Sequence, residues 1–341
     1  MIASTRLRVM GAVFLLAHGA VLLADVVGPY NPTTQHRELP FASPTAVRFV
    51  DAEGRWHLRP FVYRMVARSD AFASYHEDQT QVFPVRLFVA SEPYRVAGFT
   101  LRWRLFGIDE PARLFLVGAD GYGRDQFSRL LHGGRVSLLV GLLATSLTVG
   151  LGLVLGIVSG FYGRWLDDAI MRIAELFLAL PWIYLLFAVR ASLPLHLPPE
   201  RAFLLIVLVI GLVGWTRPAR LVRGVVLSGR TKDYVLASRA AGATTWHVIR
   251  RHLLPQTAGV ALTQAALLVP QYILAEVTLS FVGLGMGEPS PSWGGMLSAV
   301  QQYHVLVSYW WMLLPAIALV PVFLMYQALA DALIEQVTIY A

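Results

Sequence analysis

Residues 136–163 read VSLLVGLLATSLTVGLGLVLGIVSGFYG, a stretch without a single charged side chain. A helix of about 20 apolar residues is long enough to cross the hydrocarbon layer of a bilayer. A surface helix of a soluble protein would show a polar stripe at the helical period, and this stretch has none. The stretch therefore predicts a membrane-spanning helix, and it decides the fold class.

The rest of the chain has the same character. Residues 253–275 and 289–330 also lack charged side chains, and 56% of all residues are hydrophobic whereas only 14% are charged. In ordinary soluble domains about a quarter of the residues are charged. No small-x-small cleavage site follows the first apolar segment, so we expect a retained anchor and not a signal peptide. The six predicted spans, the fourth bent by Pro218, are Val9–Val27, Ser137–Gly160, Ile170–Val189, Ala202–Val226, Ala258–Phe281 and Ser308–Leu329.

The distribution of positive charge predicts the orientation. The segment between the fourth and fifth spans is rich in Arg, whereas the segment between the fifth and sixth spans contains neither Arg nor Lys. Short loops rich in Arg and Lys stay in the cytoplasm. We therefore expect a multi-pass membrane protein, with both termini cytoplasmic and residues 28–135 outside. The basic residues that set this orientation are Arg217, Arg220, Arg223, Arg230, Lys232, Arg239, Arg250 and Arg251.

Several classes of function are excluded by residues that the chain lacks. It has no Cys and a single Lys, Lys232, which lies in no Gly-x-x-x-x-Gly-Lys loop, so the chain has no P-loop for ATP. It has no His-Glu-x-x-His pattern and no recognisable Ser-His-Asp set. We expect no enzyme activity, no cofactor or metal site and no nucleic-acid partner. We attribute the net charge of +7 mainly to basic residues that set the membrane topology and that lie in a cytoplasmic loop suited to docking a partner.

Between the first two spans the sequence predicts a small extracytoplasmic domain that contains β-strands. Phe99, Leu101 and Trp103 alternate with polar residues, which is the period of a strand with one apolar face. Residues 47–50 and 85–89 are further strand candidates. Its Arg residues alternate with apolar ones and form no basic tract, so we expect a solvated strand face and not a nucleic-acid patch, and the functional alternative is a docking or guiding surface on the outer side.

A turn and an interfacial helix are expected to lead into the second span. Arg124, Arg129 and Arg135 would reach lipid headgroups there. Within the second span, the spacing of Gly152, Gly156 and Gly160 predicts close packing against a neighbouring helix. The expected division is 1–27, the first span; 28–117, the extracytoplasmic domain; 118–136, the interfacial segment; and 137–335, a five-helix core with a cytoplasmic loop at 227–257.

That cytoplasmic loop has the pattern of a helix, a glycine break and a second helix. Residues 234–241 are good helix formers, and Gly242 suits the left-handed conformation that ends a helix. Thr244 or Thr245 can cap the next helix, and Pro255 is expected to stop it before the fifth span. A rigid helix pair between two spans is a good lever for moving them.

The loop resembles the EAA motif of permease subunits in binding-protein-dependent ABC importers. Gly242 and Pro255 keep the interval of that motif, and Ala237 matches its first Ala. Leu236 and Ser238 depart from it, since the family often has Glu and Ala there. Residues 118–141 and 275–294 resemble the segments around the second and fifth spans of peptide and nickel permeases. The chain is thus identified as similar to the C-type subunit of the oligopeptide/dipeptide permease family.

The resemblance implies an all-α polytopic fold of the type I ABC-importer kind, with the β-containing domain as an addition. It implies a homologous second permease, two cytoplasmic ATPases that bind ATP and Mg, an extracytoplasmic peptide-binding protein and surrounding membrane lipid as partners. The chain itself would form half of the translocation pathway for di- or oligopeptides. The residues implied to dock the ATPase are Asp233, Tyr234, Ala237, Arg239, Ala240, Gly242, Ala243, Trp246, Ile249, Arg250, Leu253 and Pro255.

Two acidic residues at membrane depth leave alternatives open. Charged groups in spans usually face the bundle interior or a water path, which makes Glu175, Glu276 and nearby Phe281 candidates for the translocation path or its gate. The alternative interpretation is that the two acids form interhelical hydrogen bonds and have only a structural role. The alternatives to a peptide permease are a proton-coupled carrier that uses both acids, an ABC permease for nickel or another solute, and a membrane scaffold.

Overall fold

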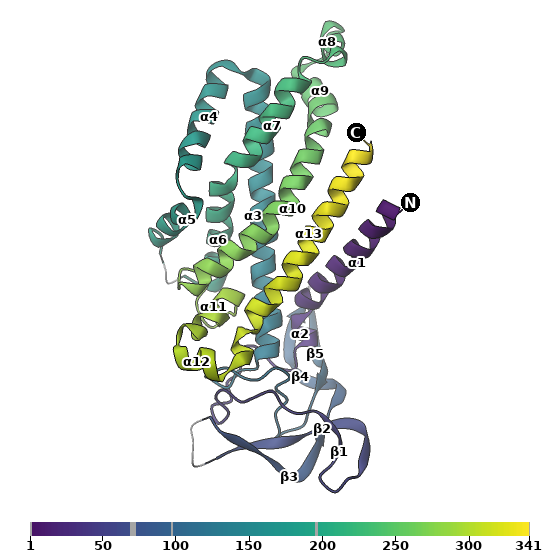
Figure 1. The fold of residues 1–341 in the computed structure, drawn as a ribbon, viewed down its shortest axis with the longest axis vertical. Coiled ribbons are helices and arrows are strands. Elements are labelled where there is room, and N and C mark those ends of the chain that lie inside the picture. Colours follow the sequence, from purple (N-terminus) through teal and green to yellow (C-terminus); the bar gives the residue numbers. More distant parts are fainter. Residues whose placement is uncertain (1, 69–72, 97, 195–196, 341) are drawn as a thin grey trace. The chain divides into compact units, whose positions relative to one another are not determined.

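The computed structural model describes residues 2–68, 73–96, 98–194 and 197–340, and within these ranges the side chains of residues 8–335. The described chain is mostly helical (Figure 1). It forms two compact units that are discontinuous in sequence. A helical unit comprises Met1–Phe14, Leu138–Gly285 and Val320–Ala341, and a mixed unit comprises Leu15–Ser137 and Met286–Leu319. The division into 1–27, 28–117, 118–136 and 137–335 stays a prediction, because compactness and position relative to a membrane are different properties.

The helices are as follows. The first two are α1 (Ile2–Leu22) and α2 (Ala24–Val27), and the long α3 (Gln126–Tyr162) follows the strands. Then come α4 (Arg164–Ala179), α5 (Trp182–Ala191), α6 (Pro199–Gly214), α7 (Thr216–Gly229), α8 (Asp233–Ala240), α9 (Thr245–Val248), a π-helical turn (Ile249–Leu253) and α10 (Leu254–Phe281). The last are α11 (Trp293–Leu297), α12 (Tyr303–Ser308), a 3₁₀ turn (Trp310–Leu313) and α13 (Leu314–Tyr340).

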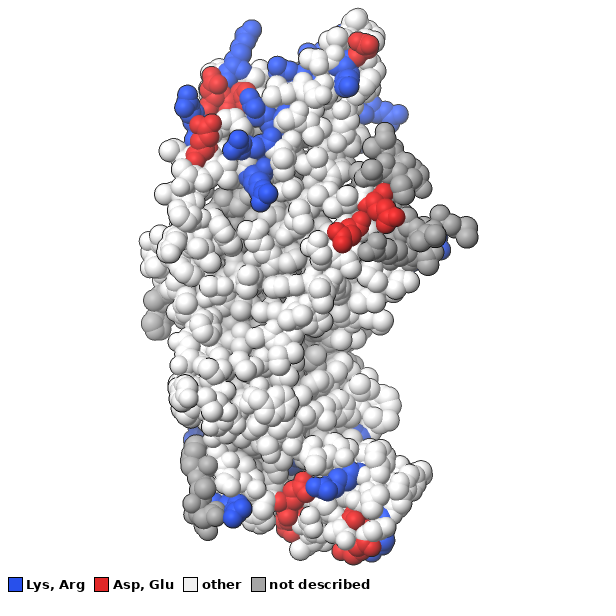
Figure 2. Space-filling view, viewed as in Figure 1, with Lys and Arg blue, Asp and Glu red and all other residues white. Residues whose placement is uncertain are grey.

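Among the described residues, three helical segments are long and apolar enough to cross a membrane. They are Gln126–Tyr162, Thr245–Phe281 and Trp310–Glu335. The count rises to five if each of two bent helix pairs forms one span, while the apolar helix Arg8–Leu22 is shorter. The protein is thus a helical membrane protein, and the predicted number of six spans stays a prediction. In Figure 2 charged side chains of the helical unit gather over α4, α7 and α8, acidic side chains also lie over the C-terminal part of α13, and the middle of the visible surface is uncharged.

The two bent helix pairs are α4 with α5 and α6 with α7, and each has a proline at or near its bend. The expectation of one helix over Ile170–Val189 is wrong, because α4 and α5 meet at 91°. Leu180 between them is extended, as the residue before Pro181 tends to be. The bend expected at Pro218 is confirmed: α6 and α7 meet at 44°, and α6 ends at Gly214. A proline ring clashes with the carbonyl four residues earlier, which here belongs to Gly214.

The close packing expected from the glycine spacing in the second span is confirmed. A Cβ added at Gly156 would lie 2.6 Å from the carbonyl oxygen of Ala219, and one at Gly160 would lie 2.9 Å from the Cβ of Val226. A Cβ added at Gly152 would lie 2.5 Å from the Cβ of Pro218. The glycine face of α3 therefore seats α7, the helix that leads into the cytoplasmic loop predicted from the sequence.

The mixed unit contains two antiparallel sheets. One has the order β1-β2-β3 (Arg48–Val50, Trp56–Ala67, Tyr75–Pro84), and the other pairs β4 (Arg86–Val96) with β5 (Phe99–Gly107). Strands are thus present at all three predicted places, and β5 covers the alternating segment. Beside the first sheet, Leu39, Ala42, Phe115 and Ala119 form a buried apolar cluster.

Candidate functional site

The break between α8 and α9 has the geometry that the sequence predicts. Gly242 has φ +85°, the left-handed conformation that favours glycine. Its N–H donates to the carbonyl of Arg239 at 2.9 Å, and the N–H of Ala243 donates to the carbonyl of Ser238 at 3.1 Å. This pair of bonds is a Schellman motif, which satisfies carbonyls at a helix end. Thr244 caps α9, since its hydroxyl accepts the N–H of His247 at 3.3 Å.

The expected helix stop at Pro255 is wrong. The helix continues without interruption from Thr245 to Phe281. The reason is the π-helical turn Ile249–Leu253, where the N–H of Leu254 donates to the carbonyl of Ile249 five residues earlier. A wider turn makes room for the ring of Pro255, which would clash with the preceding turn of a regular helix. The second helix of the loop is therefore rigidly continuous with the predicted fifth span.

An apolar cluster fixes the base of the loop to the helical unit. Val235 of α8, Val248 of α9 and Leu253 are buried against Val222 and Val226 of α7. Ile157 of α3 belongs to the same cluster, and Ala243 and Ile249 pack against it. Leu253, Ile249 and Ala243, predicted as docking residues, thus face this cluster wholly or in part.

The opposite face of the loop is exposed and partly apolar. Trp246 is 68% exposed, Leu236 50% and Tyr234 48%, although all three side chains are large and hydrophobic. Figure 1 shows α8 at one end of the helical unit, beyond the other helices. Scattered exposed apolar residues need no explanation, but several on one short helix pair are typical of an interaction surface. The other exposed residues of the predicted docking set are Asp233, Ala237, Arg239, Ala240, Gly242, Arg250 and Pro255.

Contacts made by three Arg side chains join α7 and the loop to the neighbouring helices. Arg223 donates two hydrogen bonds to the carboxylate of Asp167 on α4, at 2.5 and 2.6 Å. Arg230 donates to the carbonyl of Gly160 at 2.9 Å, and the guanidinium of Arg239 lies 4.7 Å from the ring centroid of Phe161. Sequence analysis missed Asp167, because a partner more than fifty residues away leaves no local pattern.

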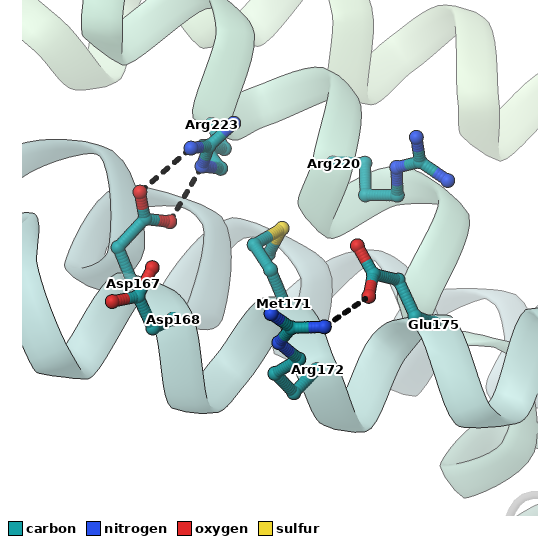
Figure 3. Close-up of a pocket in the computed structure, with 7 residues that line it drawn as sticks. All are labelled: Asp167, Asp168, Met171, Arg172, Glu175, Arg220 and Arg223. Carbon is teal, nitrogen blue, oxygen red and sulfur yellow. Dashed lines mark hydrogen bonds and ion pairs between the residues drawn. The ribbon is translucent and has the colours of Figure 1, made fainter.

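Glu175 lies on α4 beside a charged pocket of about 290 Å³ (Figure 3). Its side chain is 61% exposed and 3.9 Å from Arg172 of the same helix. Figure 3 shows Arg220 and Arg223 reaching the pocket from α7, with Asp167 and Asp168 on the side of α4. Glu175 is thus placed among charged groups at the end of the helical unit that carries α8.

Glu276 has the opposite environment. It is fully buried in α10, and its carboxylate accepts the hydroxyl hydrogen of Ser280 at 2.6 Å. Phe281 ends the same helix and is half-buried. Glu276 does not line the pocket of Glu175, so the structure does not bring the two predicted acids together.

A second ionic cluster lies in the mixed unit. Arg124 donates to both carboxylate oxygens of Glu288, at 2.7 and 3.0 Å, and Arg129 donates to Glu288 at 3.0 Å. Arg124 also donates to Asp120 at 2.7 Å. Burial raises the pKa of Glu288, but hydrogen bonds and charge from the two Arg residues outweigh it and leave that pKa below its usual value. Arg124 and Arg129 are themselves buried.

The expectation that Arg124 and Arg129 reach lipid headgroups is therefore wrong, whereas the same expectation for Arg135 stays a prediction, because its side chain is 28% exposed. The first two are paired inside the unit, and Arg135 donates to Asp25 at 2.7 Å. Trp293 adds a further link by donating to the carbonyl of Leu130 at 2.9 Å. The two stretches that resemble permease motifs, 118–141 and 275–294, are thus joined through side chains. Sequence analysis missed Glu288, although it lies within the second of these stretches.

No group of His, Asp and Glu in the described part of the chain has the geometry to hold a metal ion. The site is thus composed of an exposed helix pair on a fixed base, with acids placed separately in the helical unit. This arrangement offers a surface for binding and for transmitting movement.

Comparison with known proteins gives consistent similarities. Residues 152–338 match the family model described as binding-protein-dependent transport system inner membrane component. A Brucella ovis protein named as a peptide permease is 37% identical over 217 residues, which cover 63% of this chain and 70% of that protein. The dipeptide transport system permease protein DppC of Bacillus subtilis is 38% identical over 196 residues, covering 58% and 59%. A structure of the MetNI methionine ABC transporter in an inward-facing conformation aligns with a TM-score of 0.44 and 19% identity, over 61% of this chain and 95% of that one.

Proposed function

Because this chain belongs to the family of binding-protein-dependent transport system inner membrane components, we propose that it is the C-type permease subunit of an ATP-driven peptide importer. As a permease component it is not an enzyme. The relatives named as peptide and dipeptide permeases support peptides as the solute. Nickel or another solute is the alternative within the same class of transporter.

The observation that carries the proposal is the construction of residues 233–255. Their apolar base packs on α3 and α7, and their second helix continues into α10. A force applied to exposed Trp246 or Tyr234 is therefore transmitted to helices of the helical unit. Closure of an ATPase dimer bound to this surface would move these helices and switch the pathway between inward-facing and outward-facing states.

The partners follow from this role. Each of two cytoplasmic ATPases would bind ATP and Mg and dock on one permease, and a homologous second permease would complete the pathway. Residues 28–117 would form an extracytoplasmic domain against which a peptide-binding protein delivers its cargo. The chain itself would carry no cofactor.

We also propose six spans in a bacterial inner membrane, with both termini in the cytoplasm. The ring centroids of Phe14 in α1 and Tyr326 in α13 are 5.4 Å apart, at 88°. Figure 1 shows the N-terminal end of α1 and the C-terminal end of α13 on the same side of the helical unit. This arrangement supports a common side for the two termini.

Glu276 and Phe281 at the end of α10, and Glu175 on α4, stay candidates for the translocation path or its gate. A proton-coupled carrier would need its acids linked by a proton path. Glu175 lines a charged pocket whose lining residues do not include Glu276. ATP-driven transport is therefore the better-supported function.

A matched pair of glycine substitutions tests the loop. In Gly242→Ala the added methyl group meets no atom within 4 Å, but the left-handed conformation costs a non-glycine residue about 1 to 2 kcal/mol. Gly224→Ala on α7 also meets nothing within 4 Å, and its helical backbone suits alanine. We expect Gly242→Ala to reduce ATP-driven peptide uptake severalfold at equal membrane abundance, and Gly224→Ala to leave it unchanged.

Uptake in cells and ATPase binding to the purified permease would be measured for both variants. Equal uptake by the two variants would show that the loop geometry does not couple ATP to transport. If instead the assembled complex transports nickel but no peptide, the assignment of peptide as the solute is wrong, whereas the proposed coupling role of the loop stands.

A further inference from the structure

The two-stranded sheet β4–β5 is held beside the end of an apolar helix. β5 packs against α2, which follows α1 after a single residue. Arg104 of β5 donates to the carbonyl oxygens of Gly28 at 2.7 Å and Tyr30 at 2.8 Å. Figure 1 shows β5 directly beside α2. These contacts fix the ribbon to the segment where the chain leaves α1.

The end of α1 marks a boundary between apolar and charged surroundings. Leu15 and Leu16 are 70% and 74% exposed, as expected of a helix that faces lipid. Two to three turns further on, Asp25 pairs with Arg135 at 2.7 Å and with His132 at 2.9 Å. Charged groups cluster where a span leaves the hydrocarbon layer, so in the proposed six-span topology α2 lies at the level of the membrane surface.

The β4–β5 sheet, here called the ribbon, extends from this level toward the end where Val96 pairs with Phe99, here called its free end. Phe106 lies 6.2 Å from Phe127 in the first turn of α3, whereas Arg104, two residues nearer the free end, bonds Gly28 beside α2. The ribbon therefore runs from the start of α3 toward α2. Phe99 lies five residues beyond Arg104, which is about 16 Å at the rise of an extended strand.

The chemistry of this end suits the boundary between water and lipid. Phe99 pairs with Val96 across the ribbon and is 74% exposed. Arg95 and Arg102 are exposed as well, at positions of the two strands whose side chains alternate with that of Phe99 and lie on the other face. Large apolar side chains combined with Arg are typical of interfacial anchors, in which the ring enters the acyl boundary and the guanidinium binds phosphate.

We propose that the end of the β4–β5 ribbon is a membrane-surface anchor that inserts Phe99 into the headgroup layer around α1. The occupant of this apolar surface is the lipid bilayer, and Arg95 and Arg102 bind phosphate groups of that bilayer. The anchor holds the β-containing part of the mixed unit at a fixed height above the membrane. The inference does not depend on which solute the protein transports.

Site-directed spin labelling tests the anchor directly, because the chain has no Cys and each introduced Cys is unique. Phe99→Cys and Thr100→Cys would be labelled with a nitroxide in the full chain, reconstituted in vesicles of phosphatidylethanolamine and phosphatidylglycerol. Leu58→Cys on β2, where the native side chain is 82% exposed in the other sheet, is the matched control. Collision with oxygen, which partitions into lipid, is compared with collision with a water-soluble nickel chelate.

We expect oxygen to dominate at residues 99 and 100 and the nickel chelate to dominate at residue 58. Dominance of the chelate at residues 99 and 100 would place the ribbon end in water and overturn the proposal. Weak collision with both reagents at these positions would show a protein partner in place of lipid, which also overturns it. Labelling at two neighbouring positions keeps the test valid if one variant fails to fold.

Discussion

At the scale of single residues, the cluster around Glu288 shows what a long-range contact adds to the sequence. Arg124 and Arg129 could be read from the sequence as headgroup ligands, because their charge precedes an apolar run. Their actual partner lies more than 150 residues away. Gly242 and Thr244 could be predicted correctly, because a left-handed glycine and a helix cap depend on local backbone alone.

Glu288→Gln should destabilise the protein. The side chain of Glu288 is 55% exposed, but both of its Arg partners are buried, so the substitution leaves two buried guanidinium groups with one carboxylate fewer, and such a loss costs about 1 to 3 kcal/mol. Glu110→Gln is the control, since the Glu110 side chain is 78% exposed and forms a surface ion pair with Arg113, and pairs of this kind contribute about 0 to 1 kcal/mol. Thermal unfolding in detergent would be compared at pH 7, and equal melting temperatures for the two variants would contradict the account.

The same variant predicts a pH dependence. The pKa of Glu288 lies below its usual value of 4.5, so its ionised form stabilises the fold fully above pH 4.5. That stabilisation is lost as the pH falls through the lowered pKa, where the neutral carboxylic acid resembles Gln. The difference in melting temperature between wild type and Glu288→Gln should therefore shrink on acidification. A difference that stays constant down to complete acid unfolding would show that the charge of Glu288 is unimportant.

At the scale of elements, the predictions that depended on prolines and glycines had different outcomes. The bend at Pro218 and the seat of α7 on the α3 glycines were predictable, because both follow from the residue itself. The break at Pro181 and the continuity through Pro255 were not, since they depend on whether the backbone can adapt. At Pro181 the chain turns by 91°, and at Pro255 a π-helical turn absorbs the ring.

Two glycines of the same helix separate packing from helix propensity. Gly156→Ala places a Cβ 2.6 Å from the carbonyl oxygen of Ala219, so α7 must shift and the protein should lose stability. Gly150→Ala meets nothing within 4 Å and should gain about 0.5 to 1 kcal/mol, because alanine favours a helix interior. Thermal unfolding of the two variants in detergent measures the contrast. A Gly156→Ala protein as stable as Gly150→Ala would refute the close packing of α3 on α7.

At the scale of the whole molecule, the apolar runs predicted a polytopic membrane protein, and the family match confirms the class. The separation of the two acids could not be predicted, since hydropathy gives the depth of a residue and not the direction of its side chain. Glu175 is exposed beside Arg172, whereas Glu276 is fully buried in α10. The exposed helix pair at residues 233–255 was easier to locate, because its helix, glycine and helix are contiguous in the sequence.

The central claim is that transport through this chain is driven by ATP hydrolysed in a partner and transmitted through residues 233–255. Peptide uptake into vesicles that contain the assembled transporter, measured with ATP, without ATP and under a pH gradient alone, tests it most directly. The account predicts uptake only with ATP, and a severalfold reduction of that uptake in Gly242→Ala but not in Gly224→Ala. Uptake driven by the pH gradient without ATP would contradict it.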